Sequence, residues 1–461
     1  MLLKYIPKKK VLLALGDILL LSLAYFLSPI IRFGVIVVSP LDDPREWFAV
    51  IVIFLFTFYV FDIYDTSSRF FSAKYIFRFA IGIFTAAGIC IVTFYFVHSL
   101  AAGRGLFVIT AVLASGFTYT WRLLFDLLFK GLLIQEKRLL IVGAGRSGTA
   151  LYDIVKSNPN YKVVGFIDDD PGKQGVLNSP MVLGGCDSLS DIVLRSRADE
   201  IAIAITHLKN VKNNELLKSI LNCKVRGINI HPMPSLYEEI TGRIPVKHVS
   251  DLWFITTTIA GVKRNIYNVK VKRLLDIFFS FMGLAFWGLP VLLPVCIAIR
   301  LDSRGPILYK QKRVGLNRSS FDLIKFRSMK IDAEMNGAEW ASEKDPRITR
   351  VGKIIRKLRI DEIPQMWNVL KGDMSFIGPR PERPEFVETL ETKIPYYALR
   401  HSLKPGITGW AQINHPYGAS EEDALEKLQY DLFYIKNLSA FLDFYILLRT
   451  VRVVLFGKGA R

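Results

Sequence analysis

The stretch of sequence that decides the fold is residues 270–300, KVKRLLDIFFSFMGLAFWGLPVLLPVCIAIR. Its apolar centre is long enough to enter a membrane, but basic residues stand on both flanks. Such charge argues against a span, because a span would move one basic flank across the membrane. Gly288 and Pro290 break the helix midway, since proline removes a backbone hydrogen bond and clashes with the preceding turn. We therefore predict a re-entrant helix over about 272–300 that bends at Pro290 and returns to the same side, with Asp276 near the lipid headgroups.

Four apolar segments precede this stretch, and each is long enough to cross about 30 Å of hydrocarbon. Basic residues cluster before the first segment and between the second and third, whereas the other loops are acidic or short. Under the positive-inside rule, both ends of this block face the cytoplasm. We interpret Asp17 and Asp62 as residues at the wet ends of spans rather than as an intramembrane site. The predicted spans are 11–38, 47–64, 75–100 and 105–129.

Alternating strand and helix signals from about 137 to 260 predict a doubly wound parallel sheet between the membrane segments. A buried strand ending at Val142 leads into a GxGxxG loop that opens a helix, and an acidic residue follows the next strand about 20 positions later. This spacing is typical of the dinucleotide fingerprint. A Tyr-x-x-x-Lys spacing occurs in this region only at Tyr152 and Lys156, in the helix that directly follows the loop, and none lies further downstream. A domain that binds NAD(P) or another nucleotide and an empty, regulatory or dimerising domain are therefore equally open. The candidate nucleotide-binding residues are Gly143, Gly145, Gly148 and Asp168.

The composition of the chain limits the classes of molecule that it is expected to bind. A net charge of +19 suits nucleic acid, anionic lipid or a phosphorylated substrate, and 51% of the residues are hydrophobic. The aromatic residues lie mostly in apolar runs rather than among the basic residues, and no nucleic-acid motif is visible. We therefore expect no nucleic acid partner and favour membrane lipids and a phosphorylated substrate. The four cysteines are scattered singly, which indicates neither a zinc site nor a disulfide framework.

The adjacent pair Asp361-Glu362 is the strongest sign of chemistry, and it stands in a strongly basic region. Pro364 fits the first turn of the next helix, which places Asp361 at or near its N-cap and Glu362 in its first turn. An aspartate there is commonly only a cap, worth about 1 kcal/mol. Here helix amides and neighbouring arginines keep Asp361 ionised and attract a phosphate. Such a carboxylate can attack the phosphate as a nucleophile, while Glu362 holds Mg²⁺.

Cations near this pair supply candidate phosphate contacts. One lies on a hairpin predicted over 307–326 and one directly after its last residue, one lies on an amphipathic helix predicted over 348–358, and one follows Gly378-Pro379. Arginine suits bidentate phosphate contacts, whereas lysine supplies a point charge. The alternative is a basic face that meets anionic headgroups. The candidate substrate- and phosphate-binding residues are Lys325, Arg327, Arg356 and Arg380.

Several independent motifs of the C-terminal region occur together. They are Lys272-Arg273 with Asp276, Gly305-Pro306, Lys325 to Met329, Asp361 to Gln365, Asn368 to Ser375, Gly378 to Pro381, and Lys404 to Trp410. In this combination the region resembles the bacterial sugar transferase family, the monotopic polyprenyl-phosphate phosphoglycosyl transferases. The upstream part resembles the large exopolysaccharide-type members, which prefix four membrane helices and a nucleotide-sugar-dehydratase-like Rossmann domain. One departure is Leu289 before Pro290, where some relatives have serine.

The resemblance implies a membrane protein of α plus α/β class. It implies four transmembrane helices in residues 1–134, a Rossmann-like domain in 135–262 and a mixed α/β catalytic domain in 268–461. It also implies that Asp361 is the nucleophile, that Glu362 is the Mg²⁺-associated acid together with Asp361, and that Pro379-Arg380-Pro381 helps to bind the nucleotide.

The activity that the resemblance implies is transfer of sugar-1-phosphate from a UDP-sugar to undecaprenyl phosphate, with release of UMP through a phosphosugar-aspartate. This step would initiate exopolysaccharide, capsule or O-antigen synthesis. We expect a multi-pass homodimer in the bacterial inner membrane whose catalytic domain faces the cytoplasm. Glucose and galactose are the leading sugars by resemblance, and the sequence does not decide between them.

Two other classes of function are weighed against this one. A membrane-tethered NAD(P)-dependent nucleotide-sugar dehydratase or oxidoreductase is the first, and the lack of a Tyr-x-x-x-Lys in residues 157–262 counts against it. A scaffold with an inactive transferase domain is the second, and the intact residues Asp361, Glu362 and Arg380 count against that.

Overall fold

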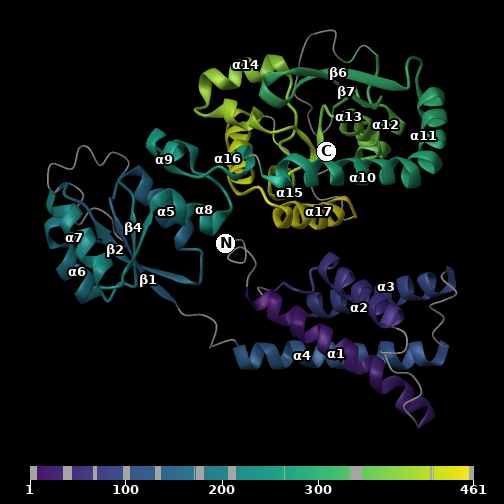
Figure 1. The fold of residues 1–461 in the computed structure, drawn as a ribbon, viewed down its shortest axis with the longest axis horizontal. Helices are drawn as coiled ribbons and strands as arrows, with labels where there is room; N and C mark the ends of the chain where they lie inside the picture. The colour runs from purple at the N-terminus through teal and green to yellow at the C-terminus, as the bar shows by residue number, and fades with distance from the viewer. Residues whose placement is uncertain are drawn as a thin grey trace. The chain divides into compact units, whose positions relative to one another are not determined.

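The computed structural model divides the chain into two compact units, Met1–Gln135 and Glu136–Arg461, and each is described by itself (Figure 1). The residues that the structure describes are 8–34, 44–65, 70–96, 104–129, 136–170, 172, 181–205, 214–263, 265–331, 333, 345–415, 418 and 420–455.

The described residues of the first unit form four apolar helices: α1 (Lys8–Phe33), α2 (Pro44–Val60), α3 (Ala73–Phe96) and α4 (Arg104–Phe129). By length and composition, α1, α3 and α4 can each cross a membrane, whereas α2 has 17 residues and is shorter than a usual span. Buried aromatic rings such as Phe54, Phe58 and Tyr75 fill the space between the helices. Residues 35–38 and 97–100 of the predicted spans lie outside the described residues.

A buried ion pair joins α1 to α4. The two terminal nitrogens of Arg122 donate to the two carboxylate oxygens of Asp17 at 2.7 and 2.8 Å, and its Nε donates to the hydroxyl of Tyr75 at 3.1 Å. Neither Asp17 nor Arg122 is exposed. The predicted place of Asp17 at a wet span end is therefore wrong. Asp62 lies in the turn after α2.

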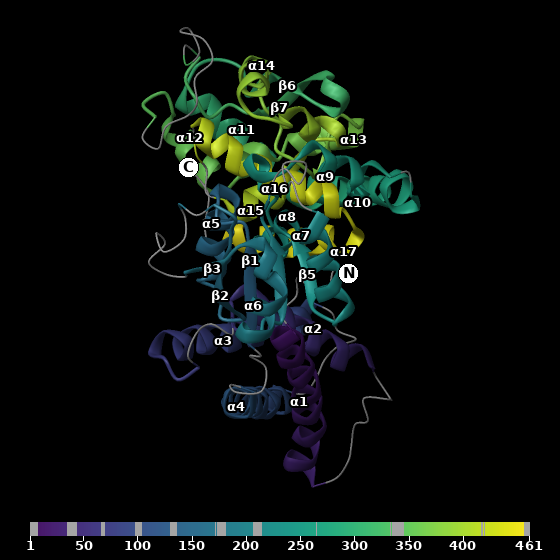
Figure 2. The same ribbon diagram turned by 90° about the vertical axis from the view of Figure 1, so that its left-hand side faces the viewer.

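The second unit begins with a five-stranded parallel sheet in the order β3-β2-β1-β4-β5, which confirms the doubly wound prediction. Helices α5 and α8 cover one face and α6 and α7 the other, each over its own apolar cluster (Figure 2). We call these elements the Rossmann-like domain. They are β1 (Lys137–Val142), α5 (Arg146–Val155), β2 (Tyr161–Ile167), β3 (Val182–Gly184), α6 (Leu189–Ser196), β4 (Glu200–Ile203), α7 (Asn214–Val225), β5 (Asn229–Pro232) and α8 (Met233–Thr241).

The C-terminal region follows helix α9 (Asp251–Thr256) and is built around two small sheets. An antiparallel hairpin pairs β6 with β7, as predicted, and a parallel pair joins β8 to β9. The elements are α10 (Lys272–Gly283), α11 (Leu289–Asp302), β6 (Leu308–Val314), β7 (Ser320–Phe326), α12 (Arg350–Lys357), α13 (Gln365–Lys371), β8 (Ser375–Ile377), α14 (Pro384–Lys393), β9 (Gly406–Thr408), α15 (Trp410–Asn414), α16 (Glu421–Asn437) and α17 (Ala440–Leu455).

Helices α10 and α11 form a bent pair. The segments Tyr267–Phe286 and Pro290–Asp302 meet at 65°, and the bend precedes Pro290 as the sequence predicts. Large apolar side chains such as Phe281 and Leu293 are more than 60% exposed, so they have no protein core to pack against.

The structure corrects the placement of Asp276 near the headgroups. Its side chain is buried in the protein, where it accepts hydrogen bonds from Ser375 Oγ at 2.9 Å and from the amide of Phe376 at 2.8 Å. Asp276 therefore fixes α10 to strand β8.

Candidate functional site

Asp361 and Glu362 lie in a one-turn 3₁₀ helix, Ile360–Glu362, between α12 and α13. Arg359 enters this turn in the left-handed conformation, with φ of 59°. The N-cap of α13 is Pro364, so the prediction that placed Asp361 at or near that cap and Glu362 in the first turn of the helix is wrong, and both residues precede the helix. The turn forms because the amides of Glu362 and Ile363 bond to the carbonyls of Arg359 and Ile360. It presents two neighbouring carboxylates ahead of the helix.

Three cations from three different elements surround Asp361. They are Lys325 on β7, Arg356 on α12 and Arg380 after β8. No described residue donates a hydrogen bond to the Asp361 carboxylate. Burial raises the pKa of Asp361 to about 7 and Glu362 adds to that rise, while the three cations act in the opposite direction. We call Lys325, Arg356, Asp361, Glu362 and Arg380 the Asp361 cluster.

Glu362 is bound by two arginine side chains, whereas Asp361 accepts no hydrogen bond from a described residue. Its Oε1 accepts from Arg380 Nη2 at 2.7 Å and lies 3.6 Å from Arg359 Nη1, and its side chain is 11% exposed. Burial opposes ionisation, but these two arginines keep the pKa of Glu362 below its usual value. Glu362 is therefore an anion that orients Arg380.

Lys325 projects from the hairpin, and its Nζ lies 5.2 Å from the centre of the Tyr309 ring. Burial, and then the charge of Arg313, lower the pKa of Lys325 to about 8. The charge of Asp361 acts in the other direction. Lys325 thus carries a proton at neutral pH and loses it in mildly alkaline solution.

The segment Pro379-Arg380-Pro381 is fixed through its backbone. The amide of Gly406 donates to the Pro379 carbonyl at 2.8 Å, and Arg313 Nη1 donates to the Pro381 carbonyl at 3.0 Å. Both prolines are buried. In the structure they hold Arg380 in place, and a nucleotide contact from this segment stays a prediction.

Arg327 differs from the other predicted phosphate contacts. Its Nη1 donates to the carbonyl of Arg304 at 2.6 Å and its Nη2 to that of Ser303 at 2.7 Å, and it is 6% exposed. It therefore ends helix α11 and does not belong to the Asp361 cluster. The predicted role of Arg327 as a substrate contact is corrected to an anchor of the bent helix pair.

Sequence reasoning missed Gln412 and Arg400. Gln412 Oε1 accepts from Arg380 Nη1 at 2.9 Å, and buried Arg400 donates to the Arg380 carbonyl at 3.0 Å and to Asp431 at 2.9 Å. Gln412 lies just beyond the motif that ends at Trp410, and this proximity is the sequence signal that could have identified it.

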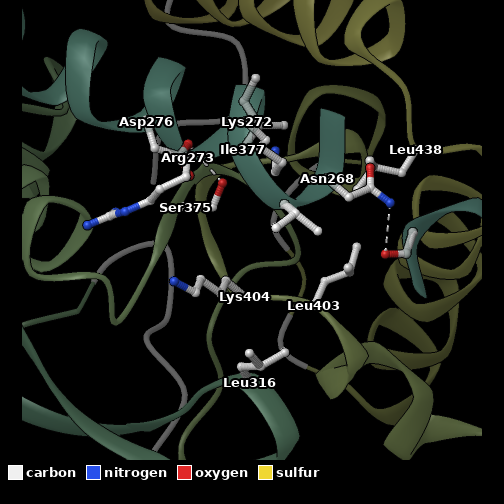
Figure 3. Close-up of a pocket in the computed structure, with 12 residues that line it drawn as sticks. Asn268, Lys272, Arg273, Asp276, Leu316, Ser375, Ile377, Leu403, Lys404 and Leu438 are labelled. Carbon is white, nitrogen blue, oxygen red and sulfur yellow. Dashed lines mark hydrogen bonds between the residues drawn. The ribbon is translucent and has the colours of Figure 1, made fainter. Parts of the chain in front are cut away.

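A separate pocket of about 320 Å³ lies between α10, β8 and the segment before β9 (Figure 3). Arg273 and Lys404 extend toward the same side of it. Arg273 donates to the carbonyls of Val369 and Leu370 at 2.6 and 2.7 Å, which places the pocket at the C-terminal end of α13. No member of the Asp361 cluster lines it.

The glycine-rich loop of the Rossmann-like domain is shaped by packing. Gly143 has φ of 106°, and a Cβ on Gly148 would lie 1.9 Å from the Gly143 carbonyl oxygen. Asp168 accepts from the amide of Ala144 at 2.7 Å, so its carboxylate braces the loop. The structure brings the loop and Asp168 together, and a bound nucleotide stays a prediction.

Comparison with known proteins matches two regions of the chain to protein families. Residues 267–457 match the family described as bacterial sugar transferase, and residues 59–234 match a CoA-binding domain. A UDP-glucose:undecaprenyl-phosphate glucose-1-phosphate transferase from Klebsiella pneumoniae is 32% identical over 72% of this chain and 70% of its own length. This protein belongs to the bacterial sugar transferase family.

Other relatives of this sugar transferase match it over shorter parts. A UDP-N-acetylgalactosamine-undecaprenyl-phosphate N-acetylgalactosaminephosphotransferase from Aeromonas hydrophila is 40% identical over 52% of this chain. An undecaprenyl-phosphate glucose phosphotransferase from Komagataeibacter xylinus is 33% identical over 70% of it. The matches span 56% and 60% of the lengths of these two relatives. The comparisons do not favour an NAD(P)-dependent dehydratase or oxidoreductase.

Proposed function

We propose that this sugar transferase moves sugar-1-phosphate from a UDP-sugar to undecaprenyl phosphate and releases UMP, which initiates polysaccharide synthesis. The observation that carries the proposal is the Asp361 carboxylate, which no described residue hydrogen-bonds and which three cations surround. A carboxylate in that setting is not occupied by a protein donor and can attack, and the cations attract phosphate.

In the first step, an Asp361 carboxylate oxygen attacks the β-phosphorus of the UDP-sugar. The bond from that phosphorus to the bridging oxygen breaks, and its electron pair leaves with UMP. The product is an acyl-phosphate that joins the sugar-1-phosphate to Asp361. Arg380 and Lys325 offset the negative charge on the transferring group.

In the second step, an oxygen of undecaprenyl phosphate attacks the same phosphorus. The acyl-phosphate bond breaks, the Asp361 carboxylate is restored and the lipid carries a diphosphate-linked sugar. Division into two steps lets a water-soluble donor and a lipid acceptor use one site in turn.

Mg²⁺ fits the two neighbouring carboxylates. The raised pKa of Asp361 shows that the protein cations leave its charge incompletely offset, and both arginine contacts of Glu362 use only Oε1. The described residues contain no group of three or more His, Cys, Asp and Glu side chains placed to hold a metal. Mg²⁺ commonly takes one or two carboxylates and completes its shell with substrate phosphates. Asp361 and Glu362 would hold it, and when bound it supplies positive charge to those phosphates.

We further propose that the α10–α11 pair enters and leaves the membrane on one face, and that four spans precede the Rossmann-like domain. The 65° bend and the exposed apolar side chains support the first part. Both ends of the helical block would then face the cytoplasm of a bacterial inner membrane, where UDP-sugars are available. We propose a homodimer as the assembly.

The proposal is tested with the purified full-length protein and a panel of UDP-sugars that includes glucose, galactose and N-acetylgalactosamine. With Mg²⁺ and undecaprenyl phosphate, one sugar should give continuous UMP release and a lipid product of matching mass. Without the acceptor, UMP release should stop near one equivalent per chain and leave a phosphosugar adduct on Asp361. Continuous turnover that needs acceptor from the first equivalent would contradict the covalent step.

A further inference from the structure

Helix α15 links the Rossmann-like domain to the Asp361 cluster, and its first residue makes the link on the Rossmann side. The indole Nε1 of Trp410 donates to the carbonyl of Gly242 at 2.9 Å. Gly242 ends α8 in the left-handed conformation, with φ of 65°, and a Cβ there would come within 3.1 Å of the Trp410 ring. The indole also stacks on Phe433 of α16, with ring centroids 5.3 Å apart. The position of α15 is therefore tied to the end of α8.

Gln412, two residues further along α15, faces Arg380. Its Nε2 donates to the carbonyl of Ile407 at 3.1 Å, which leaves Oε1 to accept from Arg380 Nη1 at 2.9 Å. The other terminal nitrogen of Arg380 donates to Glu362 at 2.7 Å. Because the Gln412 amide is neutral, it orients the guanidinium without cancelling its charge. A carboxylate at this position would compete with a phosphate for Arg380.

Helix α15 has five residues, so it offers little length in which a shift at Trp410 can be absorbed before Gln412. We propose that Gln412 is a positioning residue for Arg380, and that Trp410 lets helix α8 of the Rossmann-like domain set the position of both. This inference rests on the proposed function, in which Arg380 binds the transferring phosphate. The Rossmann-like domain then supports catalysis by holding an arginine, whether or not it binds a ligand.

Arg380 also influences the ionisation of Asp361, which gives a readout independent of turnover. The groups that face Asp361 are Glu362 beside it, Lys325 on β7, Arg356 on α12 and Arg380. Burial and Glu362 raise the pKa of Asp361, and the three cations lower it. Displacement of Arg380 therefore raises that pKa further.

The test compares Gln412→Ala, Trp410→Phe and the double variant with the unchanged full-length protein. Trp410→Phe removes the N–H donor and keeps an aromatic ring against Phe433. In the absence of substrate and of Mg²⁺, carbodiimide labelling of Asp361 is followed across pH by mass spectrometry, because the reagent reacts with the protonated carboxyl. UMP release is measured separately as kcat/KM for the UDP-sugar.

Gln412→Ala should raise the labelling midpoint by about one pH unit and lower kcat/KM on the order of 10-fold. Trp410→Phe should move both quantities in the same direction by a smaller amount. The double variant should resemble Gln412→Ala alone, because both changes act through the same side chain. A double variant whose losses multiply would refute the coupling through α15.

Arg243→Gln is the matched control. Arg243 also lies where the two domains meet, but the described contacts of its side chain are with Glu426 and Tyr430 of α16, at 4.0 Å from Nη1 to Glu426 Oε2, rather than with α15. It should leave the midpoint and kcat/KM unchanged, and melting curves should show all variants folded. An equal loss in Arg243→Gln would mean that docking of the domains in general, and not α15, is what matters.

The two proposals fail in different ways. If the unchanged protein releases no UMP from any sugar but Gln412→Ala still moves the midpoint, the proposed function is wrong and the positioning role stands. If the protein turns over and neither single variant moves the midpoint, the positioning role is wrong.

Discussion

The molecule uses arginine and carboxylate side chains in two contrasting ways. In the N-terminal unit, Arg122 bonds to both oxygens of Asp17, to the Thr118 carbonyl and to Tyr75, and none of the ion pair is exposed. In the Asp361 cluster, three cations face two carboxylates, and no described residue donates a hydrogen bond to Asp361. In the first arrangement the protein pairs both charges completely, and in the second it leaves the Asp361 carboxylate without a described hydrogen-bond donor.

The difference shows how to separate a structural ion pair from a site. A buried charge that is completely paired contributes to packing and specificity, and it has no capacity left for a ligand. Cations beside a carboxylate that no described residue hydrogen-bonds can still bind another anion, and a diphosphate is such an anion. Exposure and pairing, more than residue type, distinguish the two regions.

The largest expected effect comes from Asp361→Asn, which keeps the shape of the side chain and removes the nucleophilic oxygen. UMP release should fall on the order of 10³-fold or more, because the covalent step is lost. Melting of the protein should change little. Normal turnover with a clean background would show that Asp361 is not the nucleophile.

Arg122→Leu breaks the closed pair and leaves Asp17 buried without a partner. The helical unit should lose about 3 to 5 kcal/mol of stability, measured by thermal melting or by protease resistance in micelles. The double variant Asp17→Leu with Arg122→Leu should recover most of that loss, since two apolar side chains can replace a buried pair. If the single variant melts like the unchanged protein, the pair is not structural.

Arg380→Lys tests the Asp361 cluster while it keeps the positive charge at position 380. Lysine cannot bridge Gln412 and Glu362 with two separate nitrogens, so kcat/KM for the UDP-sugar should fall about 100-fold. Arg327→Lys is the matched control on the hairpin side, because Arg327 binds only backbone carbonyls at the end of α11 in the described structure. It should lower thermal stability while kcat/KM falls far less.

The smallest expected effect is a pH profile. Asp361 must be ionised to attack, and its pKa is raised to about 7, so kcat/KM should drop about tenfold for each pH unit below that value. Lys325 has a pKa lowered to about 8, so activity should decline again as its charge is lost above that pH. A flat profile between pH 5 and about 9 would contradict both assignments.

Local patterns in the sequence predicted the parts of the fold that depend on neighbours in the chain. The β6–β7 hairpin, the sheet around β1 and the bend before Pro290 follow from alternation, glycine spacing and proline. The Asp361 cluster was found through residues that lie within short motifs, namely Lys325, Arg356 and Arg380.

Contacts between residues that are far apart in the sequence could not be predicted from local patterns. Asp17 and Arg122 are 105 positions apart, and no local signal pairs them. Arg327 and Lys325 look equivalent in the sequence, but β7 ends at Phe326, so Arg327 leaves the pleat and turns toward α11. Gln412 acquires its role only because β9 runs beside β8.

The hydrogen bonds of Arg327 also fix the position of Lys325 relative to the end of helix α11. The end of helix α11 and the cation Lys325 are joined by a side chain and two residues of backbone, with little slack between them. If the bent pair enters a bilayer as proposed, the depth of its insertion sets the distance between the lipid surface and the Asp361 carboxylate. The phosphate of a lipid acceptor would have to reach that level, so the thickness of the membrane would affect how easily the acceptor meets the carboxylate.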